Sequence, residues 1–315
     1  MATLSIPSCE EDCRAIHDAS SDQNHLFSSL VCRTSVQRRQ IRETYKAMYG
    51  EDLVDRLCRD RMTNQKIEVR TLLYLWMLEP HEMNAVLARE ALRDVNYEAL
   101  IEMYVTCKSS QLFLINQAYR GIFKSHLDQE IIISEPSHPY QRILIALAAS
   151  HKAHQSEISR HIAKCDAKRL YEAGEGKTGG FDESVVIETF TKRSLPQMKL
   201  TFSSYKGIFG HEYAKSLKKE SCGEFEDSLR VVIKCISDPP KHFSKKLYSS
   251  MKGKKNNTRD LVRIMVTRAE MDMAEICEVF QKKYGMKLED AIREAIPDED
   301  YKDFLVAIAT TDFAA

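Results

Sequence analysis

Apolar residues along this chain recur in a helical rhythm, and the same arrangement appears four times. Each copy has two apolar residues four positions apart, a basic residue three positions later, and then two aromatic residues one helical turn apart. These positions are Leu26, Leu30, Arg33, Tyr45 and Tyr49 in copy 1; Ile101, Val105, Lys108, Tyr119 and Phe123 in copy 2; Val186, Phe190, Arg193, Tyr205 and Phe209 in copy 3; and Leu261, Met265, Arg268, Phe280 and Tyr284 in copy 4. An interval of roughly 75 to 85 residues is too long for a heptad or a short solenoid unit, so it indicates one helical module used four times.

The spacing inside each copy predicts helices with defined ends. In copy 4, Leu261, Ile264 and Met265 follow the i, i+3, i+4 rhythm of a helix with one apolar face. In three copies a glycine follows the second aromatic residue, where it suits a helix end in the left-handed conformation. The residues at this place are Gly50, Lys124, Gly210 and Gly285. A shorter apolar helix is expected to close each copy, over residues 72–78, 143–147, 229–233 and 304–308.

These patterns predict an all-α fold of four stacked helical bundles, each with about five helices. The corresponding repeats span residues 12–80, 86–153, 160–245 and 246–312. Strand-like alternation is rare, and the β-branched run at residues 131–133 is too short to build a sheet.

Composition and charge exclude several classes of protein. The formal net charge is zero, whereas a nucleic-acid-binding protein needs a basic surface, so no nucleic-acid partner is expected. No apolar run is long enough to span a bilayer. The N-terminus lacks the features of a secretory signal, and the nine cysteines are scattered rather than spaced as a disulfide framework. We therefore expect a reduced, cytoplasmic protein.

The segment around the first basic residue resembles a known family. It reads Arg33-Thr34-x-x-Gln37-Arg38-x-x-Ile41-Arg42-x-x-Tyr45, followed by Tyr49-Gly50-Glu51-Asp52-Leu53. This string resembles an annexin repeat nearly residue for residue. Two further segments resemble the plant branch of the family, Trp76-Met77-Leu78-Glu79-Pro80 and Val266-Thr267-Arg268-Ala269-Glu270. The resemblance covers roughly residues 12–312 and implies a curved disc whose convex loops bind calcium and dock on anionic phospholipid.

The annexin resemblance also implies where Ca²⁺ would bind. Carbonyl oxygens of a glycine-rich turn face the ion, and a carboxylate about 40 residues later completes a shell of six to eight oxygens. Glycine is expected there because a positive φ aims the carbonyls. Copy 3 fits best, with carbonyls of Gly176, Thr178 and Gly180 and the carboxylate of Glu220. The alternative is an ordinary loop between helices with a surface glutamate.

Copy 1 is a weaker candidate for a calcium site. Ile16, Asp18 and Ser20 hold its carbonyl positions and Asp60 its carboxylate position, but both glycines of the motif are missing. A residue with a side chain resists the conformation that the turn needs. A capped helix start is the favoured alternative for this segment.

The remaining two copies depart further from the calcium pattern. Copy 2 has no glycine in its turn at residues 93–96. In copy 4 the carboxylate position falls on Ala295 or Ile296, and lysines enter the loop. We therefore expect no calcium site in either copy. The basic residues Lys252, Lys254 and Lys255 form a loop that either meets anionic headgroups or is simply solvated.

The sequence thus predicts a peripheral protein that docks reversibly on anionic membranes, with weakened dependence on calcium. The alternative is a calcium-independent membrane-binding protein, or a scaffold for cytoskeletal or other proteins, that has lost its calcium sites. No nucleophile, base and oxyanion donors form a recognisable pattern, so an enzyme is not expected. The sequence 174–178 contains Gly-Lys-Thr, but the first glycine of a phosphate-binding loop is replaced by Tyr171.

Overall fold

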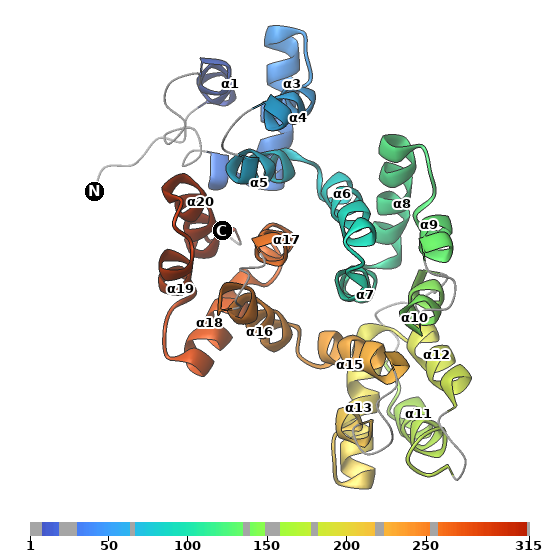
Figure 1. Cartoon of the computed structure of the whole chain (residues 1–315). Coiled ribbons are helices and arrows are strands. Elements are labelled where there is room, and N and C mark those ends of the chain that lie inside the picture. The colour runs from blue at the N-terminus through green and yellow to red at the C-terminus, as the bar shows by residue number, and fades with distance from the viewer. Residues whose placement is uncertain are drawn as a thin grey trace. The chain divides into compact units, whose positions relative to one another are not determined.

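The described part of the computed structural model is built from helices (Figure 1). It describes residues 8–18, 30–63, 67–134, 139–148, 158–177, 182–217, 224–252 and 258–313. No strand occurs within these ranges, so the all-α prediction is confirmed. Likewise, no helix in the described part is both long and apolar enough to cross a membrane.

Each copy of the sequence pattern corresponds to one group of helices. Copy 1 contains α1 (Cys9–Asp18), α3 (Ser35–Tyr49), α4 (Leu53–Thr63) and α5 (Ile67–Met77). Copy 2 contains α6 (Pro80–Arg93), α7 (Tyr97–Thr106), α8 (Ser109–Phe123), α9 (Leu127–Ser134) and α10 (Pro139–Ala148). Copy 3 contains α11 (Arg160–Glu172), α12 (Glu183–Lys192), α13 (Leu195–Phe209), α14 (Tyr213–Ser216) and α15 (Glu224–Ser237). Copy 4 contains α16 (Pro239–Lys252), α17 (Thr258–Arg268), α18 (Met273–Tyr284), α19 (Leu288–Ala295) and α20 (Glu299–Thr310).

The chain folds into two compact units, and each unit contains two copies. One unit comprises Met1–Met83 together with Pro240–Ala315, which pairs copy 1 with copy 4. The other comprises Asn84–Pro239, which pairs copy 2 with copy 3. No single copy is therefore a separate compact body.

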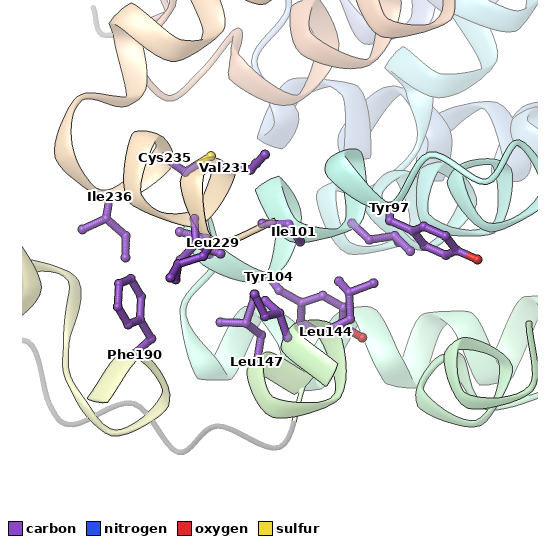
Figure 2. Close-up of a cluster of buried hydrophobic side chains, with 14 of the residues drawn as sticks. Tyr97, Ile101, Tyr104, Leu144, Leu147, Phe190, Leu229, Val231, Cys235 and Ile236 are labelled. Carbon is purple, nitrogen blue, oxygen red and sulfur yellow. The ribbon is translucent and has the colours of Figure 1, made fainter. Parts of the chain in front are cut away.

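Apolar side chains from copies 2 and 3 form one shared core. Figure 2 shows Tyr104 and Leu147 from copy 2 near Leu229 from copy 3, all of them buried. Helix α7 packs against α15, and α10 packs against both α12 and α15. Burying one large apolar side chain contributes about 1.5–3 kcal/mol, so this shared core holds the two copies together.

Contacts of a buried arginine and a buried tryptophan connect copy 1 with copy 4. The guanidinium of Arg38 lies 4.0 Å from the ring centroid of Trp76 and 2.9 Å from Glu270 of copy 4. Trp76 donates its indole hydrogen to the Leu30 carbonyl at 3.0 Å and meets Phe304 edge-on. Burial lowers the pKa of Arg38, and the Glu270 carboxylate opposes this effect. Removing Glu270 would leave a buried cation without its carboxylate partner.

The basic residue of the repeated pattern has a structural role, because in three copies its side chain forms an ion pair with an aspartate of the same copy. Arg33 and Arg193 reach back to an aspartate on the first helix of their own copy, at 2.8 Å and 2.7 Å, respectively. Arg268 instead pairs with Asp272, one turn later, at 2.5 Å. In copy 2 the backbone N–H of Lys108 donates to the side chain of Gln111 at the start of α8.

The two aromatic residues of each copy, which we call the aromatic pair, pack in the same way in all four copies. The first member is fully buried in every copy, at Tyr45, Tyr119, Tyr205 and Phe280. Its ring centroid lies 4.7–4.9 Å from that of the second member in all four pairs. The repeated sequence pattern therefore encodes a repeated packing contact.

The second member of each aromatic pair is covered by a side chain from the first helix of the same copy. His17, Tyr171 and Tyr248 stack in parallel on it at 3.8, 4.1 and 3.9 Å. In copy 2 the guanidinium of Arg89 takes this place, 5.5 Å from the Phe123 ring. This contact joins the end of the first helix to the end of the third.

The residue after each aromatic pair adopts the left-handed conformation that the sequence predicts. Gly50, Gly210 and Gly285 have φ values of 73°, 79° and 72°. Lys124 adopts the same conformation, with φ of 56°, although it carries a side chain. All four backbone N–H groups close the preceding helix by donating to the carbonyl four residues earlier. The fold thus imposes this geometry even where glycine is missing.

Replacing Lys124 with glycine should stabilise the protein. A residue with a side chain in the left-handed region strains the folded state by about 1–2 kcal/mol. Glycine removes this strain, but it also increases the conformational entropy of the unfolded chain, which offsets part of the gain. We expect Lys124→Gly to raise the free energy of unfolding by about 1 kcal/mol, measured by chemical denaturation. The reverse change, Gly210→Lys, should lower it. Equal stability of both variants and the wild type would contradict this explanation.

Candidate functional site

The residues predicted to bind calcium are only partly described by the structure. Gly176 lies in the turn between α11 and α12, and Ile16 and Asp18 lie in α1. Asp60 lies in α4, but its side chain is outside the described part. The other predicted ligands and two of the predicted basic residues also fall outside the described residues: Thr178, Gly180, Ser20, Glu220, Lys254 and Lys255. The assembly of these sites therefore stays a prediction.

The described first part of the α11–α12 turn of copy 3, residues 173–177, is internally hydrogen-bonded. The N–H groups of Gly174 and Gly176 both donate to the Tyr171 carbonyl, at 3.1 and 2.8 Å. Lys177 donates to the Gly174 carbonyl at 2.9 Å. Among the described residues, no backbone donor reaches the Gly176 carbonyl.

Position 176 needs a glycine because there is no room for a side chain, and not because the backbone has a positive φ. Its φ is outside the left-handed region, so the conformational reason expected from the sequence is wrong for this residue. A Cβ atom there would lie only 2.6 and 2.8 Å from two ring carbons of Tyr171. Tyr171 cannot easily move because its ring stacks on Phe209 at 4.1 Å. The glycine therefore lets the turn lie directly on the ring that covers the aromatic pair.

A glutamate in the same turn is anchored to the end of α13. Glu175 accepts hydrogen bonds from the Tyr205 hydroxyl at 3.2 Å and from Nε2 of His211 at 2.8 Å. Burial raises the pKa of Tyr205 to about 12, so its hydroxyl keeps the proton that it donates. Nδ1 of His211 lies 2.9 Å from the Phe209 carbonyl. Both ring nitrogens of His211 therefore lie within hydrogen-bonding distance of an oxygen acceptor.

Sequence reasoning missed this Glu175–Tyr205–His211 cluster. The three residues are spread over the turn, the aromatic pair and the segment after α13, so no short motif contains them. Tyr205 belongs to the recognised pattern, but its hydroxyl partner depends on the fold.

The far side of the turn is fixed by an aspartate that caps α12. Asp182 accepts hydrogen bonds from the Ser184 hydroxyl at 2.7 Å and from the Val185 N–H at 3.5 Å. It also forms an ion pair with Lys177 at 3.2 Å. These contacts hold the pKa of Asp182 at about 2, the Ser184 hydroxyl having the largest effect. Because the carboxylate is ionised, it offsets the lysine charge inside the candidate loop.

The residues of copy 3 fit a hard cation such as Ca²⁺. The Gly176 carbonyl is the kind of oxygen ligand that calcium takes, and the lysine in the turn is paired with Asp182. Among the described residues, contacts of Glu175 and of Asp182 hold the two ends of the turn. Calcium binding by copy 3 stays a prediction.

In copy 1 a cationic side chain lies at the end of α1, next to the predicted carbonyl positions Ile16 and Asp18. The Arg56 guanidinium donates to the His17 carbonyl at 3.1 Å, at the end of α1, and also contacts the Tyr45 hydroxyl. A further contact joins it to Nδ1 of His17 at 2.7 Å. A positive charge repels a nearby dication. The described part of copy 1 therefore fits calcium poorly.

The described parts of copies 2 and 4 also lack features of a calcium site. The turn after α6 contains no glycine, and Asn96 closes it by donating its N–H to the Ala91 carbonyl at 2.8 Å. In copy 4, the expected carboxylate position is occupied by the end of α19 and by Ile296, which is buried. Lys252 ends α16 and is exposed, 3.9 Å from Glu294. The absence of a calcium site in copies 2 and 4 stays a prediction.

We expect the substitutions Gly176→Ala and Gly207→Ala to change the free energy of unfolding in opposite directions. Gly176→Ala forces the turn or Tyr171 to move, and we expect a loss of about 1–3 kcal/mol in the free energy of unfolding. Gly207 lies in α13, and a Cβ atom added there would meet nothing within 4 Å, so Gly207→Ala should gain up to about 1 kcal/mol. Chemical denaturation measures both. A neutral Gly176→Ala would show that the ring contact does not constrain the turn.

Comparison with known proteins gives consistent matches along nearly the whole chain. The annexin family model matches residues 9–63, 165–232 and 242–308. Human annexin A3 is 33% identical over 301 residues, covering 95% of this chain and 91% of the relative. Mouse annexin A1 is 34% identical over 304 residues, covering 94% of this chain and 86% of the relative.

Solved structures agree with this assignment. The structure of annexin III superposes with a TM-score of 0.88 at 31% identity, covering 99% of this chain and 97% of that one. A structure of chicken annexin V in complex with Zn²⁺ superposes with a TM-score of 0.82 at 27% identity, covering 99% and 98% of the two chains. Sequence, fourfold helical repeat and fold agree, and the chain belongs to the annexin family.

Proposed function

We propose that this protein docks reversibly on anionic phospholipid membranes, with Ca²⁺ held by copy 3 as the main bridge. The family is known for calcium-dependent phospholipid binding. The observation that carries the proposal for this chain is the α11–α12 turn, in which Gly176 lies against the Tyr171 ring and no backbone N–H of the described residues donates to the Gly176 carbonyl. Gly176, Thr178 and Gly180 would supply carbonyl oxygens and Glu220 the carboxylate. A lipid phosphate would complete the shell of oxygens.

The proposal includes weaker dependence on calcium than four intact loops would give. In copy 1 the Arg56 guanidinium donates a hydrogen bond to the His17 carbonyl. The turn of copy 2 is closed by its own hydrogen bonds, and copy 4 has the buried Ile296 at its carboxylate position. Each of these features removes an oxygen ligand or adds a positive charge. Copy 3 would then provide most of the calcium binding.

The basic loop of copy 4 would add attraction that does not need calcium. Lys252 is exposed at the end of α16, and Lys254 and Lys255 follow it in the sequence. Each lysine near an anionic surface contributes about 1 kcal/mol, and added salt screens the effect. The protein would be cytoplasmic and peripheral on the membrane. Its plant-like segments at residues 76–80 and 266–270 support a place in the plant branch.

Vesicle cosedimentation tests copy 3 as the working calcium site. Wild-type protein should pellet with phosphatidylserine vesicles in calcium, and Glu220→Gln should lose most of this calcium-dependent fraction because a neutral amide replaces the carboxylate. Glu212→Gln is the matched control, since Glu212 is an exposed glutamate of the same copy that pairs with Lys206, and it should pellet like the wild type.

The other outcomes of cosedimentation distinguish the alternatives. Pelleting without calcium that is lost at high salt would assign the anchor to the lysines of copy 4. Absence of pelleting in every condition would overturn the membrane proposal and favour a scaffold for cytoskeletal or other proteins.

Calcium titration by calorimetry tests the weakened calcium dependence. With phosphatidylserine vesicles present, we expect one dominant site, and Glu220→Gln should remove its heat signal. Two or more sites of comparable high affinity in the wild type would contradict the proposed loss of calcium binding by copies 1, 2 and 4.

A further inference from the structure

A histidine and a cysteine lie one turn apart on the solvent-facing side of α11. His161 and Cys165 are both exposed, and Nε2 of His161 lies 3.7 Å from Sγ of Cys165. Residues four positions apart share one face of a helix, so the backbone itself brings these two side chains together. Imidazole nitrogen and thiolate sulfur are both ligands of zinc and of other borderline-soft metal ions.

The distance between the two atoms matches the distance that a bound metal ion requires. Zn²⁺ binds sulfur at about 2.3 Å and imidazole nitrogen at about 2.0–2.1 Å, with tetrahedral angles between its ligands. Two such bonds to one ion place the sulfur and the nitrogen about 3.6 Å apart. The observed 3.7 Å therefore allows both atoms to bind one ion without a change in the helix. Without an ion, the same contact is a weak thiol–imidazole hydrogen bond.

The backbone that carries this pair is held by contacts at its start and along its buried face. The Ser159 hydroxyl caps α11 by accepting a hydrogen bond from the Ile162 N–H at 3.3 Å. The side-chain amide of Gln197 bonds to both the N–H and the carbonyl of Ser159, at 2.8 and 3.0 Å. On the buried face, Asp166 pairs with Arg193 at 2.7 Å. A metal site is more precise when its ligands stand on a helix fixed in this way.

The surroundings of Cys165 differ from those of other cysteines in the chain. A cysteine that binds a metal must lose its proton. Burial raises the pKa of Cys13 and of Cys277 to about 11, so both keep the proton at neutral pH. Cys32 is exposed like Cys165, but its sulfur lies 3.8 Å from the Thr311 hydroxyl, which is not one of the usual zinc ligands. Cys165 combines an accessible thiol with an imidazole at the chelating distance.

We propose that His161 and Cys165 form a two-residue site for a borderline-soft divalent cation, with Zn²⁺ as the expected ion. Water would fill the remaining coordination positions, because both side chains are exposed. Calcium takes oxygen ligands, so this site would be separate from the proposed calcium loop of copy 3. The bound ion would connect two successive turns of α11 and stabilise the folded protein.

Nearby positive charge would limit the strength of the site. Lys164 and Lys168 are exposed neighbours of Cys165, and Lys168 lies three positions after it, on the same face of α11. Their charge repels a dication, although water and salt screen the effect. We therefore expect exchangeable binding, and we expect Lys168→Gln to tighten zinc binding.

Zinc titration by calorimetry of the reduced full chain, in buffer without a chelator, tests the pair. His161→Gln and Cys165→Ser should each weaken binding about tenfold or more, because either change leaves one ligand. Cys32→Ser is the matched control for loss of an exposed thiol and should bind zinc like the wild type. Cys165→His should restore binding, because two histidines at this spacing also chelate zinc.

Two further measurements report on the same site. Cd²⁺, used in place of zinc, should produce the ultraviolet absorption of a cadmium–thiolate bond in the wild type and in Cys32→Ser, and much less of it in Cys165→Ser. Zinc should raise the melting temperature of the wild type more than that of either ligand variant. Excess calcium should not displace the zinc.

The outcomes decide the proposal independently of membrane binding. Equal zinc affinity in the wild type, His161→Gln and Cys165→Ser would refute the site, and so would a wild type that binds no zinc. Loss of binding in Cys165→Ser with full binding in His161→Gln would show that the thiol acts without the histidine, which also refutes the proposed pair.

Discussion

The structure depends on one repeated contact, the packing of the aromatic pair beneath a side chain from the first helix. The first ring is fully buried in all four copies, and the second is covered by His17, Arg89, Tyr171 or Tyr248. Because this contact joins the ends of two helices, it sets where the following turn begins. The turn that we propose as a calcium loop in copy 3 therefore begins next to this contact.

The same contact is used differently in each copy because its polar neighbours differ. In copy 3 the hydroxyl of Tyr205 donates to Glu175 and helps to hold the turn. In copy 1 the equivalent hydroxyl of Tyr45 meets Arg56, and the guanidinium reaches the carbonyl at the helix end. The same module thus places a carboxylate beside the buried tyrosine in copy 3 and a guanidinium beside it in copy 1.

Charge in this protein is arranged mainly as internal pairs. The basic residue of the pattern meets an aspartate in three copies, and the buried Arg38 meets Glu270 across copies 1 and 4. Removing one partner of such a pair leaves an uncompensated buried charge, which is strongly destabilising. The net charge of zero therefore conceals charges that are paired inside the fold.

The sequence by itself determined the all-α class, the fourfold repeat, the helices that close each copy and the left-handed helix ends. These features follow from spacing and from local backbone preferences, which residues close in sequence decide. The sequence also singled out Gly176, but it assigned the wrong physical reason. Only the tertiary structure showed that Gly176 lies against Tyr171 and that Arg56 covers the His17 carbonyl. Each of these depends on packing that brings distant residues together or fixes a turn between helices, and spacing along the chain does not contain that information.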